Sequence, residues 1–495
     1  MAEILEKVYG LVWGVPALVL ILGVGVYLSL RTGFAQLRLF PAACRCFLRR
    51  MLGRGERLEG VSPFQALCTA LAATVGTGNL AGVAGAIAIG GPGAIFWMWI
   101  CALLGMATKL AEAVLAVRYR VKEGEEFLGG PMYMICKGMG PRWAWLGGMY
   151  SFFGIVAAFG VGNATQINAV ITGIHDCVQA FGGTPTRQLD LFLGFILAMI
   201  VLILLLGGVS RIGRVTERLV PFAAAGYLLM GALVLILRLE AIPDALSAIV
   251  RGAFSPQAVT GGLVGSALST LRIGVSRGVF TNEAGMGTAS MAHAAARVDH
   301  PVEQGLLGIM EVFLDTIVIC TMTALVILCS GVPIPYGTDV GVTLTNHSFS
   351  AVLGDWTSIF LAGSLCLFAF ATVLGWGLYG ARCAQYLFGR DVWRKFAWLQ
   401  AGMVVVGAVM NTGTVWLLSE IVNGLMAIPN LIALAALSPE LCRLLHEYKR
   451  KTGNSAGGGT SCKFPSTPTA ANPHPCGSSI PMRWPQKSRE RRSIT

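Results

Sequence analysis

The sequence predicts an all-α polytopic membrane protein with about eleven transmembrane helices. Hydrophobic residues make up 55% of the 495 residues and charged residues only 13%. This composition leaves too little polar surface to cover a soluble core of that size. Apolar runs near the ~20 residues needed to cross a bilayer recur from Val8 to Leu437. The runs are continuously apolar instead of alternating, which favours helices over a β-barrel.

The expected spans divide the chain into an extra N-terminal helix, at residues 1–31, and two blocks of five spans, at residues 62–237 and 238–445. The first apolar run lacks a small-residue cleavage motif, so we expect a retained span and not a cleaved signal peptide. In chain order the expected spans are about 8–30, 62–88, 93–117, 143–173, 189–207, 215–237, 258–290, 305–331, 356–386, 393–411 and 414–437.

Basic residues gather in alternate loops between these spans, as cytoplasmic loops require. Residues 32–61 are strongly basic and are expected to form a cytoplasmic loop, whereas residues 331–355 contain no Lys or Arg. The N-terminus is therefore expected outside the cell and the C-terminus in the cytoplasm. The net charge of +12 follows from this topology, so we expect a lipid bilayer as partner and no nucleic acid.

Residues 446–495 change character, to Ser, Thr, Pro, Gly, Lys and Arg. Such a segment cannot bury enough apolar surface to fold, so a disordered basic cytoplasmic tail is expected. Contact of its basic residues with anionic lipid is the alternative to a solvated tail.

The second span contains polar residues about halfway along its length. Its sequence Gly76-Thr77-Gly78-Asn79 combines helix-breaking glycines with side chains that compete for backbone hydrogen bonds. Helix packing through small residues explains glycines such as Gly82, but it does not explain Thr-Gly-Asn at this depth. We therefore expect the helix to unwind here, beside a cavity within the protein.

The seventh span is interrupted in a similar way, because Gly274, Gly278, Gly285 and Gly287 alternate with polar side chains. Five spans per block is an odd number, so the two blocks must lie inverted in the membrane. Broken helices from inverted repeats meet near the midplane and form a substrate and ion site. Free amides at such a break suit a carboxylate, and free carbonyls suit a sodium ion.

Two segments carry a specific resemblance to a known family. Residues 76–120, which begin GTGNLAGVAGAIAIGGPGAIF, and residues 276–296, SRGVFTNEAGMGTASMAHAAA, resemble the alanine or glycine:cation symporter family, often called sodium:alanine symporters. The likeness runs from the first span to about Leu445. It implies a leucine-transporter-like core of inverted five-helix repeats, and a bacterial cytoplasmic (inner) membrane protein that imports a small neutral amino acid with sodium. It implies no enzyme activity and no cofactor beyond the coupling ion.

The resemblance also assigns roles to residues at the two breaks. Thr77, Gly78 and Asn79 would bind the substrate carboxylate, and Phe280 would line the side-chain end of the pocket. The expected sodium ligands are Ala72, Thr74, Val75 and Asn79.

Three further residues are candidates for the binding site, because polar or mid-span aromatic side chains inside a transmembrane helix need an explanation. Gln166 could bind the substrate ammonium, although an interhelical hydrogen bond is nearly as good an interpretation. Thr372 and Trp376 lie one turn apart on one helix face. Thr372 offers a hydroxyl to sodium or caps its own helix, and Trp376 lies mid-span, which favours a pocket wall over an interfacial anchor.

Three acidic residues inside the spans are candidates for gating or ion coupling. Glu311 and Asp315 lie four residues apart in the eighth span, and an ionisable pair at this depth is expected to be functional. A salt bridge to Lys109 or Arg272 is an equally good interpretation of these two. Glu283, at the second break, could gate or coordinate.

Two other functions were weighed against sodium:amino acid symport. Coupling to protons, or transport of another small solute, fits the same fold. A channel fits less well, because channels are built from pore helices around one axis, whereas inverted broken helices indicate alternating access.

Overall fold

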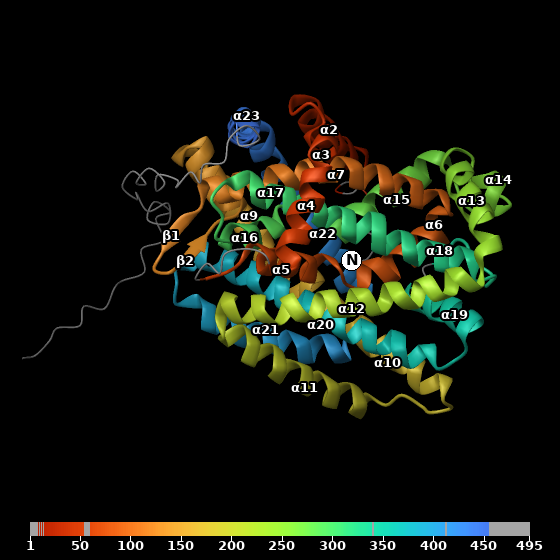
Figure 1. The fold of residues 1–495 in the computed structure, drawn as a ribbon. Coiled ribbons are helices and arrows are strands. Elements are labelled where there is room, and N and C mark those ends of the chain that lie inside the picture. The colour runs from red at the N-terminus through yellow and green to blue at the C-terminus, as the bar shows by residue number, and fades with distance from the viewer. Residues whose placement is uncertain are drawn as a thin grey trace, which may run out of the picture.

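The structure is a computed structural model that describes residues 8, 10, 12, 14–53, 60–338, 341–410 and 413–454. Over this part of the chain it is a bundle of helices with one small β-hairpin. Figure 1 shows the helices running side by side, with the hairpin at one end and α13, α14 and α19 toward the other. The all-α architecture predicted from the sequence is confirmed.

The N-terminal half, up to Leu237, covers the first six predicted spans, and its elements follow in chain order. They are α2 (Val15–Arg31), α3 (Ala35–Arg38), α4 (Phe40–Met51), α5 (Pro63–Thr74), η1 (Gly78–Gly82), α6 (Val83–Gly90), α7 (Gly93–Tyr119), β1 (Val121–Glu123), β2 (Glu126–Leu128), α8 (Pro131–Met134), η2 (Ile135–Met139), η3 (Pro141–Trp143), α9 (Ala144–Phe159), η4 (Gly160–Ala164), α10 (Thr165–Ala180), α11 (Arg187–Leu206) and α12 (Gly208–Leu237).

The C-terminal half begins with a short turn of helix after α12. Its elements are η5 (Leu239–Ala241), α13 (Ile242–Phe254), α14 (Pro256–Thr260), α15 (Ala267–Asn282), α16 (Thr288–Ala295), α17 (Pro301–Val312), η6 (Phe313–Cys320), α18 (Thr321–Cys329), α19 (Gly341–Leu353), α20 (Thr357–Phe388), α21 (Val392–Val409), α22 (Gly413–Ala436) and α23 (Ser438–Asn454).

Helices lie at the positions of all the predicted spans, although not all of them could cross a membrane alone. Six helices are long and apolar enough to do so, and the number rises to eight when each of two bent pairs counts as one span. Among the described residues, α2 is shorter than this standard, and the pair α15 and α16 is interrupted and polar. A polar helix is tolerated at this depth only when protein surrounds it.

The seventh span begins later than predicted. Helix α14 ends at Thr260, and Gly261 and Gly262 then take positive φ values of 65° and 83°. Such a backbone ends a helix, and the next one starts only at Ala267, where the Ser266 side chain accepts a hydrogen bond from the Ser269 amide. The predicted start at residue 258 is therefore wrong by about nine residues, because the turn chemistry of the two glycines was missed.

The helices differ in how much of their surface other helices cover. Within its most apolar stretch, α7 is 83% buried, whereas α11 and α12 are each only 28% buried. Helix α7 packs against α15 and α17 at the centre of the bundle. The exposed faces of α11 and α12 carry large apolar side chains such as Phe192, Phe195, Phe222 and Leu229. These faces are suited to contact lipid.

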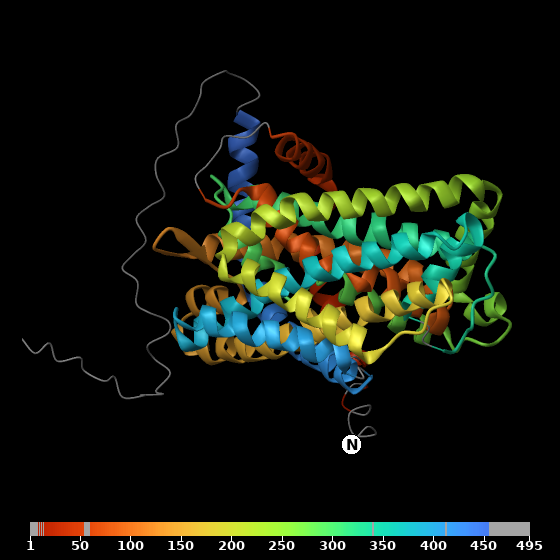
Figure 2. The same ribbon diagram turned by 90° about the horizontal axis from the view of Figure 1, so that it is seen from below.

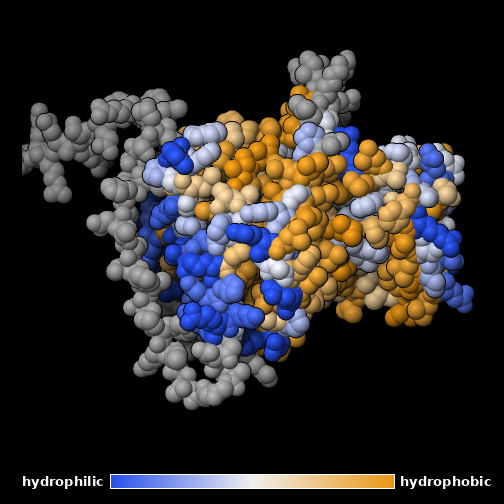
Figure 3. All heavy atoms as spheres, turned by 90° about the horizontal axis from the view of Figure 1, so that it is seen from above, coloured by the Kyte–Doolittle hydropathy of each residue, from blue (hydrophilic) through white to orange (hydrophobic). Residues whose placement is uncertain are grey.

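Loops that were predicted to share one side of the membrane lie at one end of the bundle. Arg382 pairs with Glu126 of the β-hairpin at 2.9 Å, and Arg118 pairs with Glu440 at 2.7 Å. The hairpin lies at the same end in Figures 1 and 2. Figure 3 shows a broad apolar surface across the middle of the molecule, with hydrophilic side chains toward the two ends. This distribution is expected of a protein that spans a bilayer.

The C-terminal tail starts later than predicted. Helix α23 continues to Asn454, so the boundary at residue 446 is wrong, and residues 455–495 lie outside the described part of the chain. Hydrogen bonds from Arg443 and then Arg118 lower the pKa of Glu440 to about 2. The contact with Arg118 joins α23 to the end of α7, and the contact with Arg443 stabilises a turn of α23 itself, which explains why a polar sequence is helical here.

Close packing at Gly93 gives a test of the fold. A Cβ atom at Gly93 would lie 2.0 Å from the Gly252 carbonyl carbon, so Gly93→Ala must push α7 away from α13. We expect a loss of about 1–3 kcal/mol in the free energy of unfolding, measured by thermal melting of the purified protein. The control is Gly402→Ala in α21, where no atom lies within 4 Å of the new Cβ. Equal melting temperatures for the two variants would contradict this packing.

Candidate functional site

The first break lies between α5 and η1, where the chain bends by 51°. The Gly76 amide donates to the Asn79 side-chain oxygen Oδ1 at 2.8 Å, in place of the Ala72 carbonyl that a continuous helix would use. Asn79 is fully buried, so its side chain satisfies the backbone where the helix opens. The Ala72 carbonyl loses its regular donor and becomes available to a cation.

Gln166 lies against the first break. Its Oε1 atom accepts a hydrogen bond of 2.9 Å from the Thr77 hydroxyl and a longer one, of 3.5 Å, from the Thr77 amide. Its amide nitrogen donates to the Val161 carbonyl at 3.1 Å, within the π-helical turn η4. The sequence left two roles for Gln166, binding of the substrate ammonium or an interhelical hydrogen bond. In the structure the hydrogen bond is formed.

Thr372 approaches the same break from α20. A Cβ atom at Gly76 would lie 2.5 Å from the Thr372 hydroxyl oxygen and 3.3 Å from Gln166 Oε1. The Thr372 hydroxyl donates to the Phe368 carbonyl at 3.1 Å, which leaves its oxygen lone pairs as acceptors or ligands. Glycine is required at position 76 because two polar side chains occupy the space that a side chain would need.

The predicted sodium ligands on α5 are all buried at its end. Thr74 donates weakly to the Ala70 and Leu71 carbonyls, at 3.4 Å each, and the Val75 amide donates to the Leu71 carbonyl at 2.7 Å. The side chain of Asn79 is engaged with the backbone and with η6, so it organises the break in this conformation. Among the predicted ligands, the Thr372 hydroxyl oxygen is the one that approaches the break from another helix.

Phe280 lies on the other side of the first break. A Cβ atom at Gly78 would be 3.4 Å from the Phe280 ring and 3.2 Å from the Thr281 methyl group. Gly78 therefore allows α15 to approach the unwound segment closely. The structure brings Phe280, Gly78 and Asn79 into one region of the bundle.

Trp376 is buried between η4 and the second break. A Cβ atom at Gly162 would lie 2.3 Å from the Trp376 Cβ atom, and the indole Nε1 donates to Glu283 Oε1 at 2.8 Å. The other carboxylate oxygen of Glu283 accepts from the Thr288 hydroxyl at 2.5 Å. The tryptophan is thus held by a hydrogen bond to an acidic residue, which the sequence did not indicate.

The second break lies between α15 and α16. Glu283 ends α15 with a φ of 53°, a left-handed conformation that is uncommon for a residue with a side chain. The amides of Gly285 and Gly287 donate to Glu112 Oε1 at 2.9 and 3.0 Å, and Asn430 donates to the same oxygen at 2.7 Å. A carboxylate of the protein itself therefore fills the amide site at the second break.

Asp315 connects the two breaks. Its Oδ1 atom accepts from Asn79 at 2.7 Å, and its Oδ2 atom accepts from the Thr316 hydroxyl at 2.8 Å. Asn282 donates to the same hydroxyl at 3.2 Å and accepts from the Ala284 amide at 3.0 Å. A continuous chain of hydrogen bonds thus runs from η1 through η6 to the end of α15.

Glu311 belongs to a buried cluster of charged and polar side chains that reaches the second break, because the Lys109 ammonium also lies 3.9 Å from Glu112. Its carboxylate lies 3.2 Å from the Lys109 ammonium and 2.8 Å from His293 Nε2, and all three side chains are fully buried. Gln304 Nε2 lies 2.7 Å from His293 Nδ1. The salt bridge to Lys109 is therefore present for Glu311. Asp315, by contrast, bonds to Asn79 and Thr316.

Sequence reasoning missed several of these residues. Glu112, His293, Gln304 and Asn430 were not among the candidates, although each is fully or almost fully buried. The available signal was the presence of Lys109 and Glu112 inside an apolar run, since charged groups at that depth need partners.

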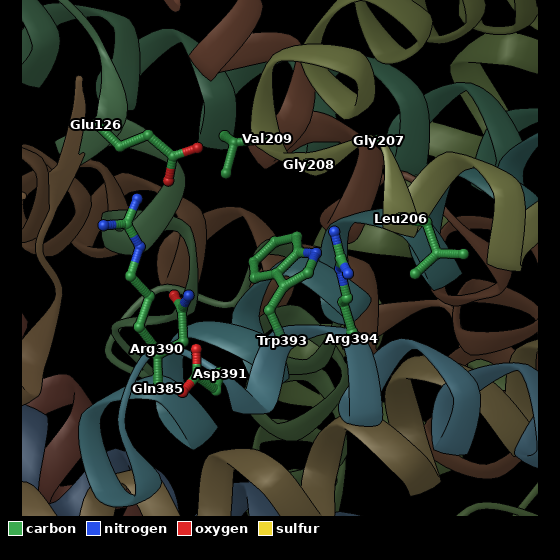
Figure 4. Close-up of a pocket in the computed structure, with 10 residues that line it drawn as sticks. All are labelled: Glu126, Leu206, Gly207, Gly208, Val209, Gln385, Arg390, Asp391, Trp393 and Arg394. Carbon is green, nitrogen blue, oxygen red and sulfur yellow. The ribbon is translucent and has the colours of Figure 1, made fainter. Parts of the chain in front are cut away.

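The two breaks are closed off from the larger cavities of the described chain. One cavity, of about 570 Å³, lies at the hairpin end between the α11–α12 corner and the start of α21. Figure 4 shows Arg390 pointing toward Glu126 across it, with Trp393 and Arg394 beside them. No residue of the breaks lines this cavity. Ala72, Thr77, Asn79, Thr372 and Trp376 are all buried.

Comparisons with known proteins agree with this architecture. The sodium:alanine symporter family matches residues 1–459. The chain is 44% identical over 442 residues to the sodium/alanine symporter AgcS of Methanococcus maripaludis, covering 88% of this chain and 94% of that protein. It is 38% identical over 460 residues to the probable sodium/glutamine symporter GlnT of Bacillus subtilis, covering 91% and 92%.

Among solved structures, the chain is similar to MhsT, crystallised in complex with L-phenylalanine. The TM-score is 0.57 at 13% identity, over 79% of this chain and 99% of that one. This likeness concerns the fold alone. It confirms the leucine-transporter-like core with broken helices that the sequence predicted.

The contacts of Glu112 give a test of the second break. In Glu112→Gln the negative charge near Lys109 is lost. One carboxylate oxygen also becomes an NH2 group, which cannot accept the hydrogen bonds that Gly285, Gly287 and Asn430 donate. Removing one partner from a buried charged cluster costs about 3–5 kcal/mol, so we expect a clearly lower melting temperature in detergent. Glu240→Gln, an exposed residue after α12, is the control and should melt like the wild type. An unchanged melting temperature for Glu112→Gln would show that the break does not depend on this carboxylate.

Proposed function

The chain belongs to the sodium:alanine symporter family, and we propose that it imports a small neutral amino acid, alanine or glycine, together with sodium by alternating access. The observation that carries this proposal is the first break. There an unwound backbone, the hydroxyls of Thr77 and Thr372, and the amides of Asn79 and Gln166 converge in an apolar protein interior. Such a break offers donors to a carboxylate and oxygen ligands to a cation.

The substrate carboxylate is proposed to bind at Thr77, Gly78 and Asn79. Gln166 Oε1 now accepts from the Thr77 hydroxyl and amide, so its side chain would have to turn away when a carboxylate arrives. Once turned, its amide oxygen could accept from the substrate ammonium. The second break is a poorer carboxylate site, because Glu112 already occupies its amides.

Sodium is proposed to bind beside the substrate, through oxygens of Ala72, Thr74, Val75, Asn79 and Thr372. The Ala72 carbonyl and Thr372 hydroxyl support this most strongly. Asp315 would couple the ion site to the second break, because it bonds to Asn79 and reaches Asn282 through Thr316. Glu283 would act as a gate through its hydrogen bond to Trp376, and Glu311 would hold Lys109 as part of the scaffold.

The proposed membrane is the bacterial cytoplasmic membrane, with the N-terminus outside and the C-terminus inside. The positive charges of the predicted cytoplasmic loops support this orientation, and these loops contact one another at one end of the bundle. We also propose that the inverted repeats are residues 62–237 and 238–445, since the first span of each block is a broken one.

Uptake of labelled alanine and glycine into proteoliposomes tests the function. We expect saturable uptake that requires an inward sodium gradient, and little uptake when a proton gradient replaces it. Uptake driven equally well by protons would overturn the sodium assignment. A single-channel current in a planar bilayer would overturn alternating access.

Asn79→Ala tests the first break directly. The variant loses the bonds to the Gly76 amide and to Asp315. We expect sodium-driven alanine uptake to fall at least tenfold while the protein still reaches the membrane. Asn163→Ala is the matched control, because that buried amide donates to the Gln400 carbonyl at 2.8 Å, away from the break. Equal uptake by both variants would remove Asn79 from the site.

Phe280→Ala tests the size filter. The Phe280 ring lies against the unwound segment at Gly78, so its removal leaves space for a larger substrate side chain. We expect valine and leucine to compete with labelled alanine in this variant, and alanine affinity to fall several-fold. Phe195→Ala, on the exposed face of α11, should keep the wild-type rank order of competitors. The same rank order in active Phe280→Ala would place the side-chain pocket elsewhere.

A further inference from the structure

Three arginines form a basic stripe at the start of α12, outside the site described above. Arg211, Arg214 and Arg218 are exposed, and their spacing of three and four residues puts them on one face of the helix. The three side chains line a groove of about 810 Å³. The other residues that line it are apolar: Leu204, Val215, Leu219 and Phe222.

Several arginines at this end of the molecule have acidic partners, whereas these three have none among the residues that the structure describes. Arg118, Arg297, Arg382 and Arg443 each pair with a glutamate. Within the described chain, no ion pair joins Arg211, Arg214 or Arg218 to a carboxylate. A positive-inside loop needs positive charge but does not need an uncompensated cluster on one helix face.

The few polar contacts of the stripe are with the backbone and keep the charges in place. Arg211 NH1 donates to the Ile203 carbonyl at 3.1 Å, and Arg214 Nε donates to the Ser210 carbonyl at 3.3 Å. Glu217, on the same helix, accepts a hydrogen bond from Gln65 of α5 at 2.9 Å. Backbone contacts therefore hold two of the arginine side chains in place, but no carboxylate of the described residues neutralises the charge of the stripe.

The groove continues into the most lipid-exposed surface of the described bundle. Helices α11 and α12 are the spans that other helices cover least, at 28% each. Phe222 lies one turn beyond Arg218 and is 73% exposed. A charged end above an apolar groove matches a molecule with an anionic head and a hydrocarbon tail.

We propose that this groove binds one anionic phospholipid of the bilayer, with its phosphate against the three arginines and an acyl chain along Leu219 and Phe222. The volume suits a single lipid-sized ligand better than a second protein chain. A protein partner would also have to supply acidic groups to all three arginines as it removed them from water. This proposal does not depend on which solute is transported.

Native mass spectrometry of the purified full chain tests the proposal, with equal amounts of phosphatidylglycerol and phosphatidylcholine added. We expect the wild type to retain phosphatidylglycerol about tenfold more than phosphatidylcholine. The variant with Arg211→Gln, Arg214→Gln and Arg218→Gln should lose this preference. The corresponding triple lysine variant keeps the charge and should retain the preference, which separates loss of charge from misfolding.

The matched control carries Arg187→Gln, Arg238→Gln and Arg251→Gln, three exposed arginines on other segments. It should keep the wild-type preference. The proposal is overturned if the glutamine triple keeps the preference, or if the control loses it equally. It is also overturned if inorganic phosphate alone displaces the bound lipid completely, which would indicate an ion site. A dimer that dissociates only in the glutamine triple would assign the groove to a second copy of the chain instead.

Discussion

The need to satisfy every backbone polar group inside a hydrocarbon layer governs this structure. A helix can open at membrane depth only where other protein groups replace the lost backbone hydrogen bonds. At the first break Asn79 supplies that replacement, and at the second break Glu112 does so. Each of these two residues makes further hydrogen bonds, Asn79 to Asp315 and Glu112 to Asn430.

The two breaks are satisfied in different ways, and the difference has a functional consequence. At the first break the group that replaces the backbone acceptor is the neutral side-chain amide of Asn79, and a neutral hydrogen bond can exchange partners at modest cost. At the second break the Glu112 carboxylate accepts from two backbone amides and from Asn430, and these three bonds hold the backbone of the break in place. This asymmetry favours the first break as the place where ligands enter and leave. Hydrogen bonds through Asp315 and Thr316 link the first break to Asn282 at the end of α15.

Most of the fold could be predicted from the sequence, because continuous apolar runs and glycine-rich interruptions are local signals. The first break was located within one residue, since Gly76 and Asn79 stand out in an apolar run. The start of α15 and the end of α23 were misplaced, because a glycine turn and a salt-bridged helix end were not recognised.

The partners of the buried charged residues could not be predicted in the same way. Glu112 meets Gly285 across 173 positions of the chain, and Trp376 meets Glu283 across 93. Such contacts depend on how the helices pack, and sequence spacing carries no information about them. For Glu311 the sequence offered no means of choosing a partner between Lys109 and Arg272, and the structure shows a 3.2 Å contact with Lys109.

The central claim is that sodium and the amino acid share the first break. Their binding must then be coupled, and coupling between two ligands is reciprocal. The most direct measurement is calorimetric titration of the purified protein with alanine at several sodium concentrations, and with sodium at several alanine concentrations. The account predicts that sodium tightens alanine binding by the same factor by which alanine tightens sodium binding. An alanine affinity that does not change with sodium would contradict it.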